Sequence, residues 1–199
     1  MTSLHEIGLH HGTDKAHLHE YTKFYDKLLR PYRNKPVTVV EIGVLGGNSL
    51  LMWQDWFTQP GTRIYGVELE DRPGLPRFDE RTRIFINDAY QPNAVFDITN
   101  ATGPIDVWIE DGSHFVKHQK DALRLWWPHI RSGGVAILED THSSYHYPWW
   151  DTQEEKFVHS LNSFIDQVNE DGANHCGVPT HSEVEEIIFR KSLVVIKKR

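Results

Sequence analysis

Acidic side chains gather behind two predicted strands in the second half of the chain. Asp111 follows the predicted strand 105–109, and Glu139 and Asp140 stand where the predicted strand 134–139 ends. Clustered carboxylates repel one another unless a cation neutralises them. Three carboxylates with room for water suit a hard divalent ion such as Mg²⁺, so the pattern predicts a metal site.

Two histidines follow these acids closely. His114 comes three residues after Asp111, and His142 comes two residues after Asp140. An imidazole beside a metal-bound hydroxyl can act as a general base, because its pKa lies near the working pH. We predict this role for His114, with His142 as the weaker rival. The alternative for His114 is a surface or helix-capping histidine.

A strand that runs into a glycine turn marks a second candidate site in the first half. Residues 37–42 read as a buried strand and 43–47 as a turn, with a helix starting at Asn48 and Ser49. Such a turn lets a ligand approach the backbone and meet free N–H groups at the helix start. The spacing Glu41-x-Gly-x-x-x-Gly47 differs from the dinucleotide pattern Gly-x-Gly-x-x-Gly. The Glu41 carboxylate suits a ligand with a cationic or hydrogen-donating head.

Two more predicted strands also end in acids. Glu68 ends the second predicted strand, where an acidic residue commonly binds the hydroxyls of a ribose. Asp88 follows the third predicted strand and could contact the adenine end of a nucleoside. Capping of the next helix could explain any one of these acids. It explains five successive acidic strand ends poorly.

Strands and helices alternate along the chain. The predicted strands are 37–42, 63–68, 83–87, 105–109, 134–139, 184–190 and 193–198, and the predicted helices between them are 48–57, 92–100, 115–130 and 154–169. Alternation with near-continuous apolar strands predicts a parallel sheet covered on both faces. The last two strands are joined too tightly for a crossover and must pair antiparallel. The expected fold is α/β, with a seven-stranded, mainly parallel sheet ending in an antiparallel hairpin.

The region before the first strand is predicted to be helical. Apolar side chains at helical spacing predict a helix over 14–30 that Pro31 ends, with N-cap chemistry in the segment 12–15. The length of 199 residues fits one domain with a full core. We expect a single domain over 1–199, with an N-terminal helical segment (1–34) and a Rossmann-like core (37–199).

Composition argues against several classes of partner. A net charge of −7, with no basic run before the short end 197–199, argues against nucleic acid. The sequence has no signal peptide and no apolar run of membrane-spanning length, which predicts a cytoplasmic protein without a membrane span. The single cysteine, Cys176, excludes an internal disulfide and fits a reducing compartment.

Taken together, these motifs resemble the class I S-adenosylmethionine-dependent, metal-dependent O-methyltransferases. The chain is similar above all to the macrolide-sugar O-methyltransferases of the mycinamicin VI 2''-O- and macrocin types, and to related rhamnosyl O-methyltransferases. The matching segments cover residues 8–145 and include Gly12–Lys15, Asp88–Pro92, Ile109–His114, His118-Gln119 and Leu138–Tyr145.

The resemblance implies a class I methyltransferase fold with S-adenosylmethionine over the first three strands and Mg²⁺ as a second cofactor. The implied cofactor-binding residues are Glu41, Gly43, Gly47, Ser49, Glu68, Asp88, Ala89 and Asp111, and the implied metal ligands are Asp111, Glu139 and Asp140. Glu41, Gly43 and Ser49 would lie near the methionine part, Glu68 at the ribose, and Asp88-Ala89 near adenine, with His114 as the base.

The implied reaction methylates a hydroxyl of a sugar in a glycosylated natural product or glycolipid. Metal-dependent methylation of a catechol or phenol is one alternative, since either acceptor can offer two adjacent hydroxyls to a metal. Another is a cephalosporin-hydroxylase-like component of an oxygenase system that binds S-adenosylmethionine, although the sequence lacks a 2-His-1-carboxylate spacing. A third is a relative that binds the cofactor without turnover, against which the acids and His114 argue. The aromatic loop 145–150 is expected to close over the acceptor or to form a contact in a homo-oligomer.

Overall fold

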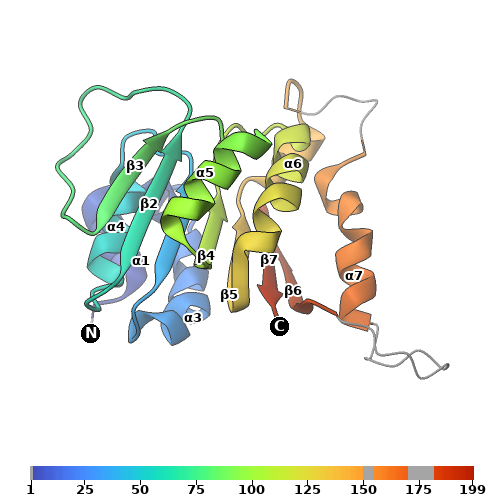
Figure 1. Ribbon diagram of the computed structural model, residues 1–199, viewed down its shortest axis with the longest axis horizontal. Helices are drawn as coiled ribbons and strands as arrows, with labels where there is room; N and C mark the ends of the chain where they lie inside the picture. The colour runs from blue at the N-terminus through green and yellow to red at the C-terminus, as the bar shows by residue number, and fades with distance from the viewer. Residues whose placement is uncertain (1, 150–154, 170–181) are drawn as a thin grey trace. The chain divides into compact units, whose positions relative to one another are not determined.

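The computed structural model describes residues 2–149, 155–169 and 182–199 (Figure 1). The chain divides into two compact units, Met1–Ala89 and Tyr90–Arg199. The sheet has seven strands, and it is mainly parallel with an antiparallel hairpin at its end. The predicted fold class is therefore confirmed, whereas the single-domain organisation over 1–199 stays a prediction.

The first unit carries three parallel strands in the order β3-β2-β1. They are β1 (Thr38–Ile42), β2 (Arg63–Glu68) and β3 (Thr82–Ile86), and the helices of this unit are α1 (Leu4–His11), α2 (Asp14–His17), α3 (Tyr21–Arg33) and α4 (Asn48–Trp56). The apolar side chains of β1 are buried, as predicted for a buried strand over 37–42. Ile42 pairs with Val67, so β1 and β2 end side by side and deliver the glycine turn beside Glu68.

The N-terminal helices differ from the prediction. The single helix expected over 14–30 is broken, because Glu20 takes a left-handed φ of 57° between α2 and α3. Pro31 does not end α3, which continues to Arg33 although a proline inside a helix removes one backbone hydrogen bond. Helix α1 was missed, although Ser3 and Glu6 form the capping box that marks its start.

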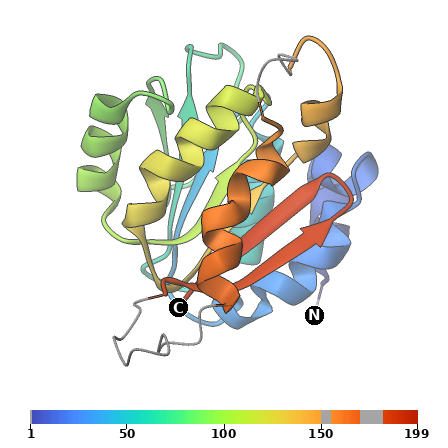
Figure 2. The same ribbon diagram turned by 90° about the vertical axis from the view of Figure 1, so that its right-hand side faces the viewer.

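The second unit carries four strands in the order β4-β5-β7-β6. They are β4 (Ile105–Glu110), β5 (Ile130–Leu138), β6 (Val184–Arg190) and β7 (Leu193–Lys198), with helices α5 (Pro92–Thr102), α6 (Val116–Trp126) and α7 (Asn162–Asn169) and 3₁₀ turns at Trp127–His129, Thr141–Tyr145 and Phe157–Leu161. β4 and β5 are parallel, and β7 pairs antiparallel with both β5 and β6. Helix α7 packs against the hairpin at β6 (Figure 2).

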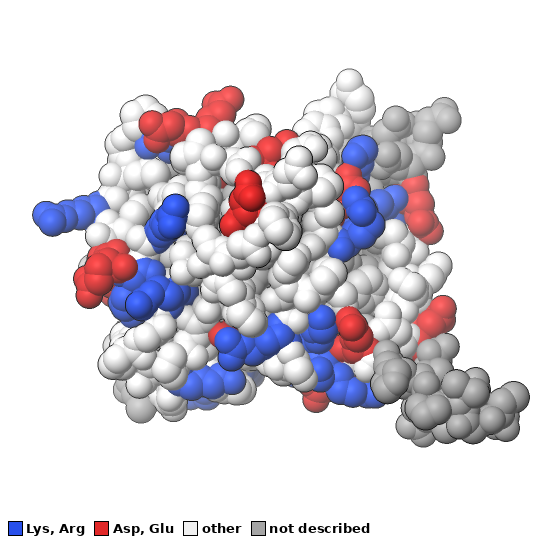
Figure 3. All heavy atoms as spheres, in the orientation of Figure 1, with Lys and Arg blue, Asp and Glu red and all other residues white. Residues whose placement is uncertain are grey.

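The surface carries charges of both signs. On the face drawn in Figure 3, basic and acidic side chains are intermingled rather than gathered into one basic patch. Within the part of the chain that the structure describes, no helix is both long and apolar enough to cross a bilayer. The expected absence of a nucleic-acid partner and the cytoplasmic location stay predictions. Cys176 and Trp150 lie outside the described residues.

Candidate active site

Three of the predicted site residues come together in the second unit. Each of Asp111, His114 and Asp140 has a ligand atom within 4.8 Å of those of the other two. Paired parallel strands explain this meeting, because Glu110 of β4 lies opposite Leu138 of β5 and the acids follow both strands at one edge. His114 Nε2 lies 3.7 Å from Asp140 Oδ2, so a carboxylate faces the imidazole that was predicted to take a proton.

The other two candidates have different surroundings. Glu139 is buried and is not part of this cluster among the described residues. Its backbone N–H donates to Glu110 O at 3.0 Å, and its carbonyl accepts from Gln119 Nε2 at 2.9 Å. His142 is more exposed than His114, and its Nδ1 lies 3.9 Å from Asp140 Oδ1. The metal role of Glu139 and the catalytic roles of both histidines stay predictions.

Backbone geometry sets two cluster residues apart. His114 has φ of 61° and Asp140 has φ of 52°, which is the left-handed region that residues other than glycine seldom adopt. Such conformations persist where the surrounding structure holds them, and they collect at functional sites. This geometry therefore supports the assignment of the candidate site to the segments that contain His114 and Asp140.

A half-buried side-chain network supports the loop 111–114, and no sequence pattern predicts it. Tyr90 Oη donates to Glu110 Oε1 at 3.0 Å and accepts from the Ser113 N–H at 3.0 Å. Burial raises the pKa of Glu110 to about 7, with the Asp111 charge adding to it and the Tyr90 hydrogen bond opposing it. Burial and the Glu110 charge likewise raise the pKa of Tyr90.

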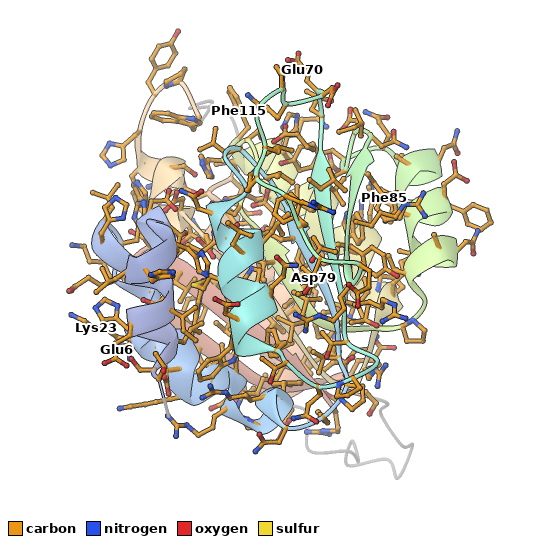
Figure 4. The ribbon with its side chains drawn as sticks, turned by 90° about the vertical axis from the view of Figure 1, so that its left-hand side faces the viewer. Glu6, Lys23, Glu70, Asp79, Phe85 and Phe115 are labelled. Carbon is orange, nitrogen blue, oxygen red and sulfur yellow. The ribbon has the colours of Figure 1, made fainter. Side chains whose placement is uncertain are left out.

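Aromatic side chains are exposed in the segments that follow the cluster residues. Phe115 comes directly after His114 and is exposed (Figure 4). Tyr147 and Trp149 are exposed in the predicted aromatic loop, and the Val116 N–H donates to Trp149 O at 3.1 Å. This hydrogen bond holds the described part of the loop against the start of α6. Its expected closure over an acceptor stays a prediction, as does a homo-oligomer contact.

In the first unit, the glycine turn has the geometry expected of it. Gly43 has φ of 90° and its N–H donates to Val67 O at 2.9 Å. Gly47 has φ of 77° and directly precedes α4, and a Cβ there would meet the Phe78 ring at 2.8 Å. The positive φ and the close approach of the Phe78 ring both require glycine at position 47.

Glu68 binds the turn with its carboxylate. Its Oε2 accepts from the N–H groups of Val44 at 3.2 Å and Leu45 at 3.0 Å. Its Oε1 accepts from the Leu69 N–H at 3.0 Å and from Arg72 at 3.2 Å. Burial alone would raise the pKa of Glu68, but these hydrogen bonds outweigh it and lower the pKa below its usual value.

The remaining cofactor candidates of this unit lie beside these elements. Ser49 is buried in the first turn of α4, and Ala89 is buried just after β3. Asp88 is half-buried, and its N–H donates to Asn87 Oδ1 at 2.9 Å. The assignment of all eight residues to a cofactor stays a prediction.

Glu41 has partners within its own unit. Its side chain is fully buried on β1, where Lys15 Nζ lies 3.1 Å from Oε1 and Trp53 Nε1 donates to Oε2 at 2.6 Å. Lys15 is also buried, so this is an internal ion pair between α2 and the end of β1. From the sequence, the segment 12–15 predicts a helix cap and matches the resembled family, but neither feature predicts this ion pair of Lys15.

Comparison with known proteins identifies the family. The sequence profile of a family described as a methyltransferase domain matches residues 40–141, about half of the chain. The chain belongs to this methyltransferase family. The match begins within β1 and ends one residue after Asp140. It therefore includes the glycine turn and all three residues of the Asp111/His114/Asp140 cluster.

Curated relatives of this chain agree with the predicted resemblance. It is 31% identical over 97% of the chain to 8-demethyl-8-alpha-L-rhamnosyl tetracenomycin-C 2'-O-methyltransferase of Streptomyces olivaceus, of which it covers 54%. It is 35% identical over 71% of the chain to mycinamicin VI 2''-O-methyltransferase of Micromonospora griseorubida, of which it covers 37%. The chain thus spans about half, or less, of the length of these relatives.

A solved structure gives the same result. The chain resembles MycE methyltransferase, solved in complex with Mg, SAH and mycinamycin VI, with a TM-score of 0.86 and 29% identity. The similarity covers 99% of this chain and 53% of the MycE chain. The fold and the resemblance to macrolide-sugar O-methyltransferases are therefore both confirmed.

The buried Lys15–Glu41 pair leads to a stability prediction. Lys15→Met should lower the free energy of unfolding by about 3–5 kcal/mol, because it leaves the Glu41 charge buried without its counter-ion. Urea unfolding followed by circular dichroism measures the change.

A matched variant and a double variant control this experiment. Lys23→Met removes an exposed lysine that pairs with Glu20, and it should leave the urea midpoint nearly unchanged. Lys15→Met combined with Glu41→Gln should recover part of the loss, since the uncompensated charge is gone. Equal midpoints for Lys15→Met and Lys23→Met would contradict the assigned role.

Proposed function

We propose that this chain carries the catalytic site of an S-adenosylmethionine-dependent, divalent-metal-dependent O-methyltransferase that acts on a sugar hydroxyl of a glycosylated natural product. The Asp111/His114/Asp140 cluster in a methyltransferase-family chain carries the proposal. The MycE structure with Mg, SAH and mycinamycin VI supports the choice of cofactors and of a glycoside acceptor.

The donor set fits the proposed metal. Asp111 and Asp140 offer carboxylate oxygens within 4.8 Å of each other, which are the ligand atoms that Mg²⁺ prefers. Glu139, next to Asp140 in the sequence, is proposed as the third ligand. When bound, a divalent ion lowers the pKa of a coordinated hydroxyl and fixes its oxygen.

His114 is proposed as the general base. It accepts the acceptor's proton at Nε2, the ring nitrogen that faces Asp140, and the Asp140 charge 3.7 Å away stabilises the resulting imidazolium. The acceptor oxygen then forms a bond to the methyl carbon, while the carbon–sulfur bond breaks and sulfur keeps its electron pair. Alignment of oxygen, carbon and sulfur supplies much of the rate through proximity.

The cofactor is proposed to bind at the glycine turn of the first unit. In this proposal Glu68 accepts hydrogen bonds from the ribose hydroxyls, and Asp88 and Ala89 contact adenine. The left-handed φ angles of Gly43 and Gly47 support this assignment, because glycine turns at a helix start commonly let a ligand approach the backbone. Arg72 must release or share Glu68 Oε1 when the ribose binds there.

Calorimetry tests the cofactor assignment. S-adenosylhomocysteine should bind the wild-type chain with low-micromolar affinity, and Glu68→Gln should weaken it by roughly tenfold through loss of charge-assisted hydrogen bonds. NAD serves as the control ligand and should give no heat, because the turn lacks the dinucleotide spacing. Folded protein that gives no heat with S-adenosylhomocysteine would overturn the cofactor assignment.

The choice of acceptor needs a separate assay. Methyl transfer from labelled S-adenosylmethionine should be measured against a panel of deoxysugar and rhamnosyl glycosides and a panel of catechols. Transfer to the glycosides supports the proposal. Transfer to catechols alone would replace it with the phenol alternative.

A further inference from the structure

The loop 111–114 is held by a side chain that lies outside the metal cluster. Tyr90 Oη joins Glu110 Oε1 to the Ser113 N–H, with both distances at 3.0 Å. The Gly112 N–H reaches the same Glu110 oxygen at 3.3 Å. Tyr90 and Glu110 therefore bind two successive backbone N–H groups of the loop that carries Asp111 and His114.

His118 supports this arrangement from the first turns of α6. Its Nδ1 lies 2.7 Å from Ser113 Oγ, and its ring stacks on the Tyr90 ring with a centroid distance of 4.3 Å and an interplanar angle of 20°. The stacking fixes the Tyr90 ring, and the hydrogen bond fixes the Ser113 side chain. The loop is thus held at its backbone and at a side chain together.

The conformation of the loop needs such support. His114 has a left-handed φ of 61°, which is unfavourable for a residue with a Cβ unless neighbouring contacts hold it. Ser113 is the residue directly before it, and it makes both hydrogen bonds, through its backbone N–H to Tyr90 and through its side chain to His118. Glu110 has no exposed surface, and hydrogen bonds in such a low-dielectric region are strong.

We propose that Tyr90 and Glu110 are positioning residues that set the divalent-metal affinity of the Asp111/His114/Asp140 cluster. Neither residue belongs to the cluster itself. They hold the loop that places Asp111 and His114 opposite Asp140. This inference rests on the proposed function, because it takes the cluster to be the metal site.

Titration with Mn²⁺ alone, followed by electron paramagnetic resonance of the free ion, tests the proposal without an acceptor. Tyr90→Phe should weaken Mn²⁺ binding by about 10–100-fold, the range for residues that orient metal ligands. Tyr65→Phe removes a tyrosine hydroxyl from β2 in the first unit and should bind Mn²⁺ as the wild type does. Asp111→Asn should abolish Mn²⁺ binding at the cluster, so the binding that it removes is the binding that belongs to this site.

Further variants guard against a folding defect. Glu110→Gln keeps the shape of the side chain but changes the partner of Tyr90, and it should weaken Mn²⁺ binding in the same direction. His118→Phe keeps a ring against Tyr90 and should have a smaller effect. Thermal melting establishes which variants are folded, and loss of stability without loss of Mn²⁺ affinity would overturn the proposal.

The outcomes separate this inference from the proposed function. If the wild type binds Mn²⁺ at the cluster and Tyr90→Phe and Glu110→Gln bind it with the same affinity, the positioning role is overturned and the metal site stands. Wild type that binds no Mn²⁺ overturns both. Weak binding by the two network variants, with Tyr65→Phe unchanged, supports both.

Discussion

Removal of divalent ions with EDTA should abolish methyl transfer by this chain, and added Mg²⁺ should restore it. The reason is that a sugar hydroxyl is too weak an acid to attack at neutral pH unless a cation lowers its pKa. Asp111→Ala should have the same effect and should not respond to Mg²⁺, because it removes a carboxylate from the cluster. Methyl transfer from labelled cofactor to the acceptor found in the screen measures both effects.

Two controls make the metal experiment specific. Asp166→Ala changes an acid on α7 and should keep full activity and the same Mg²⁺ response. Calorimetry with S-adenosylhomocysteine should still detect cofactor binding after chelation. Full turnover by Asp111→Ala after exhaustive chelation would show that the cluster does not act through a metal.

His114→Ala should lower turnover by roughly 10²–10⁴-fold, the range for loss of a general base. The side chain lies in the cluster with Nε2 facing Asp140, where it can take a proton from a bound hydroxyl. The affinity for S-adenosylhomocysteine should stay nearly unchanged, because the predicted cofactor site is the glycine turn 43–47, which does not include His114. Single-turnover kinetics at saturating Mg²⁺ separate this loss from a change in metal binding.

Other histidines provide the comparison. His142→Ala should cost less, since His142 contacts Asp140 from a more exposed position. His159→Ala, in the 3₁₀ turn Phe157–Leu161, should cost nothing. If His142→Ala is inactive and His114→Ala is active, the general base is His142 rather than His114. If both variants are active, neither histidine is the general base.

Local patterns predicted most of the sheet. The strands 63–68, 184–190 and 193–198 have the predicted bounds, because their apolar runs are bounded by turns and polar segments. Helix and strand ends near positive-φ residues were harder to predict. Glu20 breaks the N-terminal helix through a left-handed conformation that its residue type does not announce. The predicted helix 115–130 ends at Trp126, and a 3₁₀ turn containing Pro128 follows it before β5 begins at Ile130.

The candidate site could be predicted only where its residues follow strand ends. Asp111 and Asp140 were found because parallel strands deliver such residues to one edge of a sheet. Tyr90 was not found, because its partners Glu110 and Ser113 are about twenty residues away in the sequence. Lys15 was missed for the same reason, since only the folded chain brings it to Glu41.

The buried pair of Lys15 and Glu41 also bears on where the folding unit begins. The family profile starts at residue 40, yet the carboxylate at the end of β1 depends on a cation from α2, well before that boundary. A truncation at the profile boundary would strand an anion inside the protein core. The span of the family profile and the unit that folds therefore differ in this protein, because α2 supplies the counter-ion for the carboxylate that precedes the glycine turn.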